Sequence, residues 1–173
     1  MGLFDRLRRP DRSDEARATA AGFDDGPDEP LDDNLPLRTR TATLPVEERE
    51  RVDATLAELA AQGVDVGDLD SIGAALDSAL ADWLARSAKT RPDPAPLIER
   101  YAVAIGEYLT RHTDLEWLLV TDAFGTSPGV ACRADDFAVV PKDLVGVRWL
   151  SRRTGWVRDV VEHLVWVRRD RTG

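Results

Sequence analysis

The sequence predicts an α+β fold, in which a small three-stranded antiparallel meander packs against amphipathic helices and follows a disordered acidic N-terminal arm. Three observations predict it. Residues 115–141 alone have the pattern of sheet, apolar residues recur at helical spacing on both sides of them, and the N-terminal region is acidic with few large apolar residues. We therefore divide the 173 residues into a short amphipathic peptide (1–9), a disordered acidic linker (10–43) and one α+β domain (44–173).

The first nine residues place Leu3, Phe4 and Leu7 on one side of a helix and arginines largely on the other. A helix of two turns is marginal in water, so the peptide either stays unstructured or becomes ordered by docking on a partner or a membrane surface. Residues 11–36 hold nine acidic and two basic residues. They bury too little apolar surface to offset the cost of backbone ordering, about 1–2 kcal/mol per residue. We therefore predict that they form a disordered tether between the N-terminal peptide and the domain.

Three helices are predicted before the sheet. Pro45 and the glutamates that follow it favour a helix start, and Gly63 favours its end. A second apolar stripe starts from a cap at Asp68 or Asp70. The third stripe, within residues 97–109, is the most regular and leads directly into the sheet.

The predicted sheet consists of three short strands joined by polar turns. Residues 115–120 form a nearly continuous apolar run, typical of a strand buried on both faces. The chain reverses at 122–126, where Gly125 supports the turn, and further strands are expected at 130–132 and 137–140. These strands pair antiparallel, because parallel pairing needs a crossover of about a dozen residues or more.

Helical spacing returns at residues 144–150 and again from Val157 to Leu164. Valines are weak helix formers, so the sequence leaves open whether residues 156–168 form one helix or end in a strand. The predicted core residues are Leu56, Leu76, Leu80, Trp83, Ile98, Tyr101, Ile105, Trp117, Leu119, Val130, Val139 and Val147.

Charge and composition limit the classes of partner and indicate the cellular compartment. The chain has a net charge of −9, which repels nucleic acid and anionic lipid. Only residues 142–173, with eight basic and four acidic residues, reverse this balance. Because tryptophans there face a core, we interpret the arginines as a solvated rim and consider nucleic-acid binding unlikely. The single cysteine, Cys132, excludes an internal disulfide, and no run of about 20 apolar residues or export leader is present, which indicates a cytoplasmic protein.

Two sets of polar residues contain the side-chain types that metal binding or acid–base catalysis requires. His112, Asp114 and Glu116 alternate as metal ligands on a strand can, but no second His or Cys cluster completes a shell, so we expect no metal. Glu116 and Asp122 form a weak candidate polar site for a carboxylate-dependent hydrolase, although a turn-forming role for Asp122 is favoured. No nucleophile, base and stabiliser can be assigned together, so no catalytic residue and no cofactor is expected.

The segment IERYAVAIGEYLTRHTDLEWLLVTDAFGTSPGVA, followed by FAVVPKDLVGVRW, resembles the uncharacterised bacterial family called domain of unknown function 3806. The resemblance covers residues 95–153. It rests on a helix with a small-Gly-Glu-aliphatic core, a Glu-Trp strand, an Asp-x-x-Gly turn, and an apolar strand followed by Pro, a spacer and a basic residue. Val147-Arg148 stands where the family pattern has Lys-Arg. The family carries no established chemistry, so the resemblance supports the fold and implies no activity.

We therefore predict a non-catalytic cytosolic protein-interaction module, an adaptor that recruits another protein through its tethered N-terminal peptide. The alternatives are an immunity-type inhibitor that presents an acidic surface to a basic toxin, and a hydrolase centred on Asp122. The sequence specifies neither the partner nor the oligomeric state. The candidate interaction residues are Leu3, Phe4, Leu7, Arg148, Arg152 and Arg153.

Overall fold

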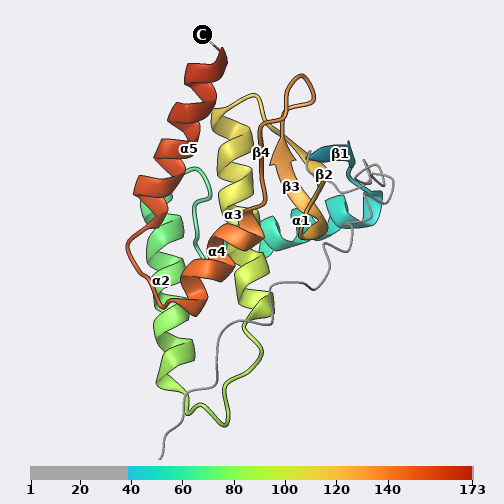
Figure 1. The fold of residues 1–173 in the computed structure, drawn as a ribbon. Helices are drawn as coiled ribbons and strands as arrows, with labels where there is room; N and C mark the ends of the chain where they lie inside the picture. The colour runs from blue at the N-terminus through green and yellow to red at the C-terminus, as the bar shows by residue number, and fades with distance from the viewer. Residues whose placement is uncertain (1–38, 173) are drawn as a thin grey trace, which may run out of the picture. The chain divides into compact units, whose positions relative to one another are not determined.

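The structure, a computed structural model, describes residues 39–172 and confirms the α+β class (Figure 1). Helix α3 lies between α2 and α5 on one side and the sheet on the other. The elements are β1 (Arg40–Thr43), α1 (Val46–Ala61), α2 (Leu69–Ala85), α3 (Ala95–His112), β2 (Glu116–Asp122), β3 (Gly125–Ala131), β4 (Ala138–Val139), α4 (Pro141–Leu150) and α5 (Val157–Thr172). Outside the described residues lie the N-terminal peptide 1–9, with Leu3, Phe4 and Leu7, and linker residues 10–38.

The sheet has four antiparallel strands in the order β1-β2-β3-β4, so the three-stranded prediction is wrong by one strand. The additional strand is Arg40–Thr43, which lies within the predicted linker; Arg40 pairs with Thr121 and Thr43 with Leu118. All four residues of β1 are exposed. The strand therefore lacks the apolar alternation that identifies a strand in a sequence, and backbone pairing to β2 holds it.

The hairpin between β2 and β3 is longer and tighter than predicted. Its strands pair from Glu116–Ala131 to Asp122–Gly125, leaving only two residues in the loop. An Asp122 carboxylate oxygen accepts a hydrogen bond from the Phe124 N–H at 2.7 Å, and Gly125 has φ +127°. The Ser, Pro and Gly residues of β3 conceal its first half in the sequence, because these residue types are typical of loops.

The predicted helices are confirmed, and α5 resolves the alternative left open at the C-terminus. Asp68 caps α2 by accepting hydrogen bonds from the backbone N–H groups of Asp70 and Ser71. Helix α5 is continuous, so the strand alternative is wrong. Val157, Val161 and Val165 are all buried on one stripe of this helix, four residues apart. Burial of that stripe outweighs the modest helix propensity of valine.

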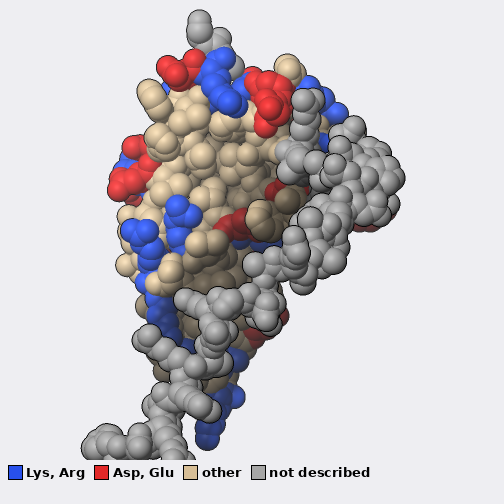
Figure 2. Space-filling view, viewed as in Figure 1, with Lys and Arg blue, Asp and Glu red and all other residues tan. Residues whose placement is uncertain are grey.

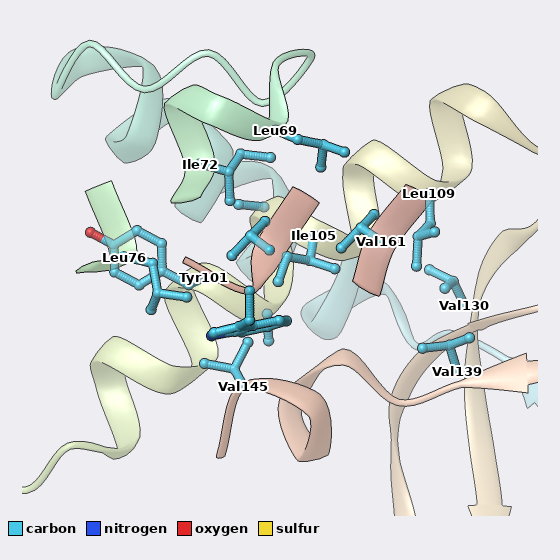
Figure 3. Packing of buried hydrophobic residues seen from close by; sticks show 14 of the residues in the cluster. Leu69, Ile72, Leu76, Tyr101, Ile105, Leu109, Val130, Val139, Val145 and Val161 are labelled. Atoms are coloured by element: carbon cyan, nitrogen blue, oxygen red, sulfur yellow. The ribbon is translucent and has the colours of Figure 1, made fainter. Parts of the chain in front are cut away.

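The core is built around α3, whose Tyr101, Ile105 and Leu109 are buried. Figure 3 shows side chains of α2, α3, α4 and α5 converging there, with Val130 and Val139 of the sheet at one side. Among the predicted core residues, Leu76, Leu80, Tyr101, Ile105, Trp117, Val130 and Val139 are buried, whereas Leu56, Trp83, Ile98 and Leu119 are only partly buried.

Val147 is an incorrect core prediction, because its side chain is 65% exposed. Its spacing from Leu144 and Leu150 suggested one buried stripe. Helix α4 instead buries Val145 and Trp149, which turns Val147 and Leu150 towards solvent.

The two faces of the sheet carry separate apolar clusters. Trp117 and Val130 belong to the main core, on the face towards α3. On the opposite face, Leu118, Val120 and Ala131 form a small buried cluster of their own. The burial of both faces confirms the interpretation of the apolar run in β2.

Candidate functional site

Arg168 of α5 is the buried charged residue among those described, with only 2% of its surface exposed. It donates to both carboxylate oxygens of Asp114, at 2.6 and 2.7 Å, and to Asp135. These hydrogen bonds lower the pKa of both carboxyl groups and raise the pKa of Arg168. We call this arrangement the Arg168 bridge. It ties α5 to the α3–β2 and β3–β4 connections.

The three residues considered as metal ligands have separate partners. His112 Nδ1 lies 2.8 Å from the Tyr108 carbonyl oxygen, Asp114 binds Arg168, and Glu116 binds Arg133 at 2.6 Å. Within residues 39–172, no group of three His, Cys, Asp or Glu residues could hold a metal ion.

Glu116 and Asp122, the weak candidate polar site, are not brought together. They occupy opposite ends of β2, six residues apart, which separates them by about 20 Å at the rise of a strand. Asp122 stabilises the hairpin turn, and Glu116 is an exposed partner of Arg133. The geometry therefore gives no support to a hydrolase centred on Asp122.

The arginines predicted to interact with a partner lie at the C-terminal end of α4 and in the loop that follows. They flank two exposed apolar side chains, Val147 (65% exposed) and Leu150 (79% exposed). Figure 2 shows basic side chains on the surface of this loop region. We call this set the α4 surface: Val147, Arg148, Leu150, Arg152 and Arg153.

The three arginines of the α4 surface form no ion pair with any residue that the structure describes. Arg148 lies over the Trp156 ring, 4.5 Å from its centroid, and donates to the Leu144 carbonyl at 3.1 Å. Burial lowers the pKa of Arg148, and the positive charge of Arg153 lowers it further. Repulsion between these neighbouring cations is thus not relieved by a carboxylate within the described domain.

The loop that carries these arginines has a defined backbone. Arg152 has φ +54°, a left-handed conformation, and its N–H donates to the Trp149 carbonyl. The Arg153 N–H donates to the Arg148 carbonyl, and the Gly155 N–H donates to an Asp77 carboxylate oxygen at 2.9 Å. These bonds terminate α4 and fix the direction in which the loop leaves it.

The structure also contains a cleft of about 400 Å³ that the sequence analysis missed; we call it the α1–α3 cleft. Its floor consists of buried Val52, Ala102, Trp117 and Pro141. Helices α1 and α3, the first half of β3 and the start of α4 form its walls. The residues come from positions up to about 90 apart in the chain, and no local spacing in the sequence signals such a juxtaposition.

The rim of the α1–α3 cleft is charged and internally paired. Arg100 of α3 lies 3.3 Å from Glu58 of α1, and Lys142 of α4 lies 2.7 Å from Glu99 of α3. A third pair, Arg51 with Glu48, lies along α1. The lining thus contains three acidic and three basic residues and is electrically balanced.

Trp117 is held in the floor of the cleft by its contact with α3. A Cβ atom on Gly106 would lie 2.3 Å from the Trp117 ring, so only glycine lets the indole approach the helix this closely. The indole N–H points towards Glu107 at 3.5 Å. Gly106, Glu107 and Trp117 belong to the motifs on which the family resemblance rests.

The described residues thus form a small α+β domain. The Arg168 bridge holds its elements together, and the α4 surface and the α1–α3 cleft are its two candidate binding sites. Residues 77–159 match the model of a family described as Domain of unknown function (DUF3806), which confirms the family resemblance over that segment. Comparisons with curated proteins and with solved structures give no match. None of the described helices is long and apolar enough to cross a membrane.

Proposed function

We propose that this protein is a non-catalytic protein-interaction module and that the α4 surface binds its partner. The observation that carries the proposal is the combination of two largely exposed apolar side chains with three arginines that lack an acidic partner in the described domain. Arginine is enriched among residues that dominate binding energy at interfaces.

The chemistry of the α4 surface favours a partner segment with carboxylates around one or two apolar side chains. Carboxylates would supply the ion pairs that the arginines lack, and apolar groups would cover Val147 and Leu150. A polyanion such as nucleic acid is less suitable, because the described residues contain 22 acidic and 17 basic side chains, which repel it at long range.

The adaptor arrangement extends this proposal to the N-terminus. In it, Leu3, Phe4 and Leu7 dock on one protein while the domain binds another, so the chain brings the two together. Deletion of residues 1–10 is then expected to abolish recruitment of one partner and to leave binding at the α4 surface unchanged, as measured by pull-down with each purified partner.

A site-specific crosslinking experiment tests the α4 surface. A photoreactive amino acid replaces Leu150 in the full-length chain in its native host, and the crosslinked protein is identified and purified. We expect the purified partner to bind the Val147→Ser/Leu150→Ser variant and the Arg152→Glu/Arg153→Glu variant at least tenfold more weakly than the wild type. Its affinity for the wild type should fall markedly as the salt concentration rises. Val46→Ser is the matched control, since Val46 is similarly exposed on a different helix. Equal binding by all variants would refute the proposal, and so would a requirement for nucleic acid.

A further inference from the structure

We propose that the α1–α3 cleft is a second binding site, separate from the α4 surface, and that it accepts an extended peptide segment with an apolar side chain placed over Trp117.

The size and the floor of the cleft suit such a ligand. Its volume of about 400 Å³ lies within the range of ordinary ligand pockets, about 300–1,000 Å³. The floor residues Val52, Trp117 and Pro141 are buried parts of three different elements, so the floor is apolar and preformed. An apolar side chain placed there loses its contact with water without requiring the domain to rearrange.

An open strand edge borders the same cleft. Strand β4 pairs only with the end of β3, at Val130 and Ala131, and the Cys132 N–H donates to the Phe137 carbonyl just beyond. Backbone groups of alternate residues point to the same edge of a strand, so those of Thr126 and Pro128 point to the β4 side. Among the described residues no strand pairs there, and both residues line the cleft.

This open edge offers a specific set of hydrogen-bonding groups. Thr126 supplies an N–H and a carbonyl, whereas Pro128 supplies only a carbonyl because proline lacks the N–H. Proline also weakens the edge as a template for indiscriminate strand pairing. A short extended peptide fits these groups better than a long added strand, and its backbone would pair as in other modes of strand addition.

The rim favours a peptide of balanced charge. Its acidic and basic residues are equal in number, so a strongly charged ligand gains little from the cleft as a whole. The two ion pairs that join different elements, Arg100–Glu58 and Lys142–Glu99, are partly exposed and contribute little on their own. A peptide side chain of either sign can therefore replace one partner of such a pair at small cost.

The family-motif residues contribute to this site directly. Gly106 allows Trp117 to lie against α3, and Trp117 forms the cleft floor. The part of the chain that matches the family model thus includes the floor residues Ala102, Trp117 and Pro141, whereas the floor residue Val52 and the rest of α1 lie before residue 77.

Selection from a random heptapeptide display library against the full-length chain tests the inference. We expect enriched peptides that share one large apolar position and carry little net charge. Thr55→Tyr places a ring in the cleft from α1, where Thr55 is half-buried and lines it, and should weaken binding at least tenfold. Ala54→Tyr, at the exposed neighbouring position that does not line the cleft, is the matched control and should change affinity less than twofold.

Two measurements on the wild-type chain keep the test valid even if Thr55→Tyr fails to fold. Amide chemical-shift changes on adding a selected peptide should cluster at Thr126 and at the Trp117 indole. Methylation of successive peptide nitrogens should reduce affinity at alternate positions, because only every second N–H of a paired strand faces its neighbour. Any one of four results would overturn the proposal: no peptide is enriched, Thr55→Tyr and the wild type bind equally, the chemical-shift changes are confined to the α4 surface, or methylation of the peptide does not change its affinity. Loss of binding at the α4 surface alone would overturn the proposed function and leave this site intact.

Discussion

Gly106→Ala is the substitution whose effect follows most directly from the geometry. The added Cβ would lie 2.3 and 2.4 Å from two atoms of the Trp117 ring, far inside any normal contact. The ring is rigid and only 9% exposed, so it cannot rotate away as the end of a flexible side chain would. Either α3 separates from β2 or the indole shifts out of its pocket.

The expected magnitude combines two opposing effects. Overpacking of a core costs about 1–3 kcal/mol, and a contact this short belongs near the upper end. Alanine in place of glycine inside a helix raises the free energy of unfolding by up to about 1 kcal/mol, because alanine has the higher helix propensity. The net expectation is a loss of about 2 kcal/mol in the free energy of unfolding, or about 6 °C in Tm for a domain of this size.

Gly73→Ala provides a matched control in another buried helix. Its Cβ would meet the Val157 side chain at 3.5 Å, an ordinary contact, so the propensity effect acts without a clash. This variant should be unchanged or more stable by up to about 1 kcal/mol. Urea unfolding followed by far-UV circular dichroism measures both variants against the wild type. If Gly106→Ala proved as stable as Gly73→Ala, Trp117 would not lie against α3, and the described cleft floor would be wrong.

Three further predictions follow from the described contacts. Arg168→Met should lower the free energy of unfolding by about 2 kcal/mol, measured by urea titration, because it removes charge-assisted hydrogen bonds to Asp114 and Asp135. Arg168 lowers the folded-state pKa of both carboxyl groups, so the stability that it contributes is complete above their unfolded pKa of about 3.9 and is lost as the pH falls through the lowered values. In thermal melts from pH 6 to pH 2, the Tm of Arg168→Met should therefore fall less steeply with decreasing pH than the Tm of the wild type. Val147→Ser/Leu150→Ser should change stability by less than about 0.5 kcal/mol per site, whereas Trp149→Ala in the same helix should cost about 3–5 kcal/mol. Cys132 is free and buried, so a thiol reagent should modify it slowly in the native chain and rapidly in urea; equal rates would contradict its burial.

Features encoded by local periodicity were predictable from the sequence. The apolar stripes of α1, α2 and α3 repeat at helical spacing, and the Asp68 cap precedes the second of them as expected. The hairpin was recognised from the apolar run of β2 and from the Asp122–Gly125 turn. In each case residues close in the chain carry the stabilising contact, so their spacing reveals it.

Features that depend on distant residues were not predictable in the same way. Strand β1 owes its conformation to pairing with β2, almost 80 positions later, and has no apolar pattern of its own. The cleft rim joins Glu58 to Arg100 and Glu99 to Lys142 across more than 40 residues. The exposure of Val147 depends on how α4 is rotated about its axis. The packing of Val145 and Trp149 determines this rotation, whereas the apolar residues of α4 in the sequence fit more than one buried stripe.

Helix α4 connects the two proposed binding features. Lys142 at its start lines the α1–α3 cleft, and Leu150 at its end belongs to the α4 surface. Ten residues of helix span about 15 Å, and five extended residues cover about the same distance. One partner segment of about ten residues could therefore occupy both features, and the linkage would multiply their affinities. In that case the partner crosslinked at position 150 contains a cleft-binding sequence within about ten residues of the crosslink, and Thr55→Tyr weakens its binding as well as that of the selected peptides. If Thr55→Tyr leaves that partner's affinity unchanged, the two features bind different molecules.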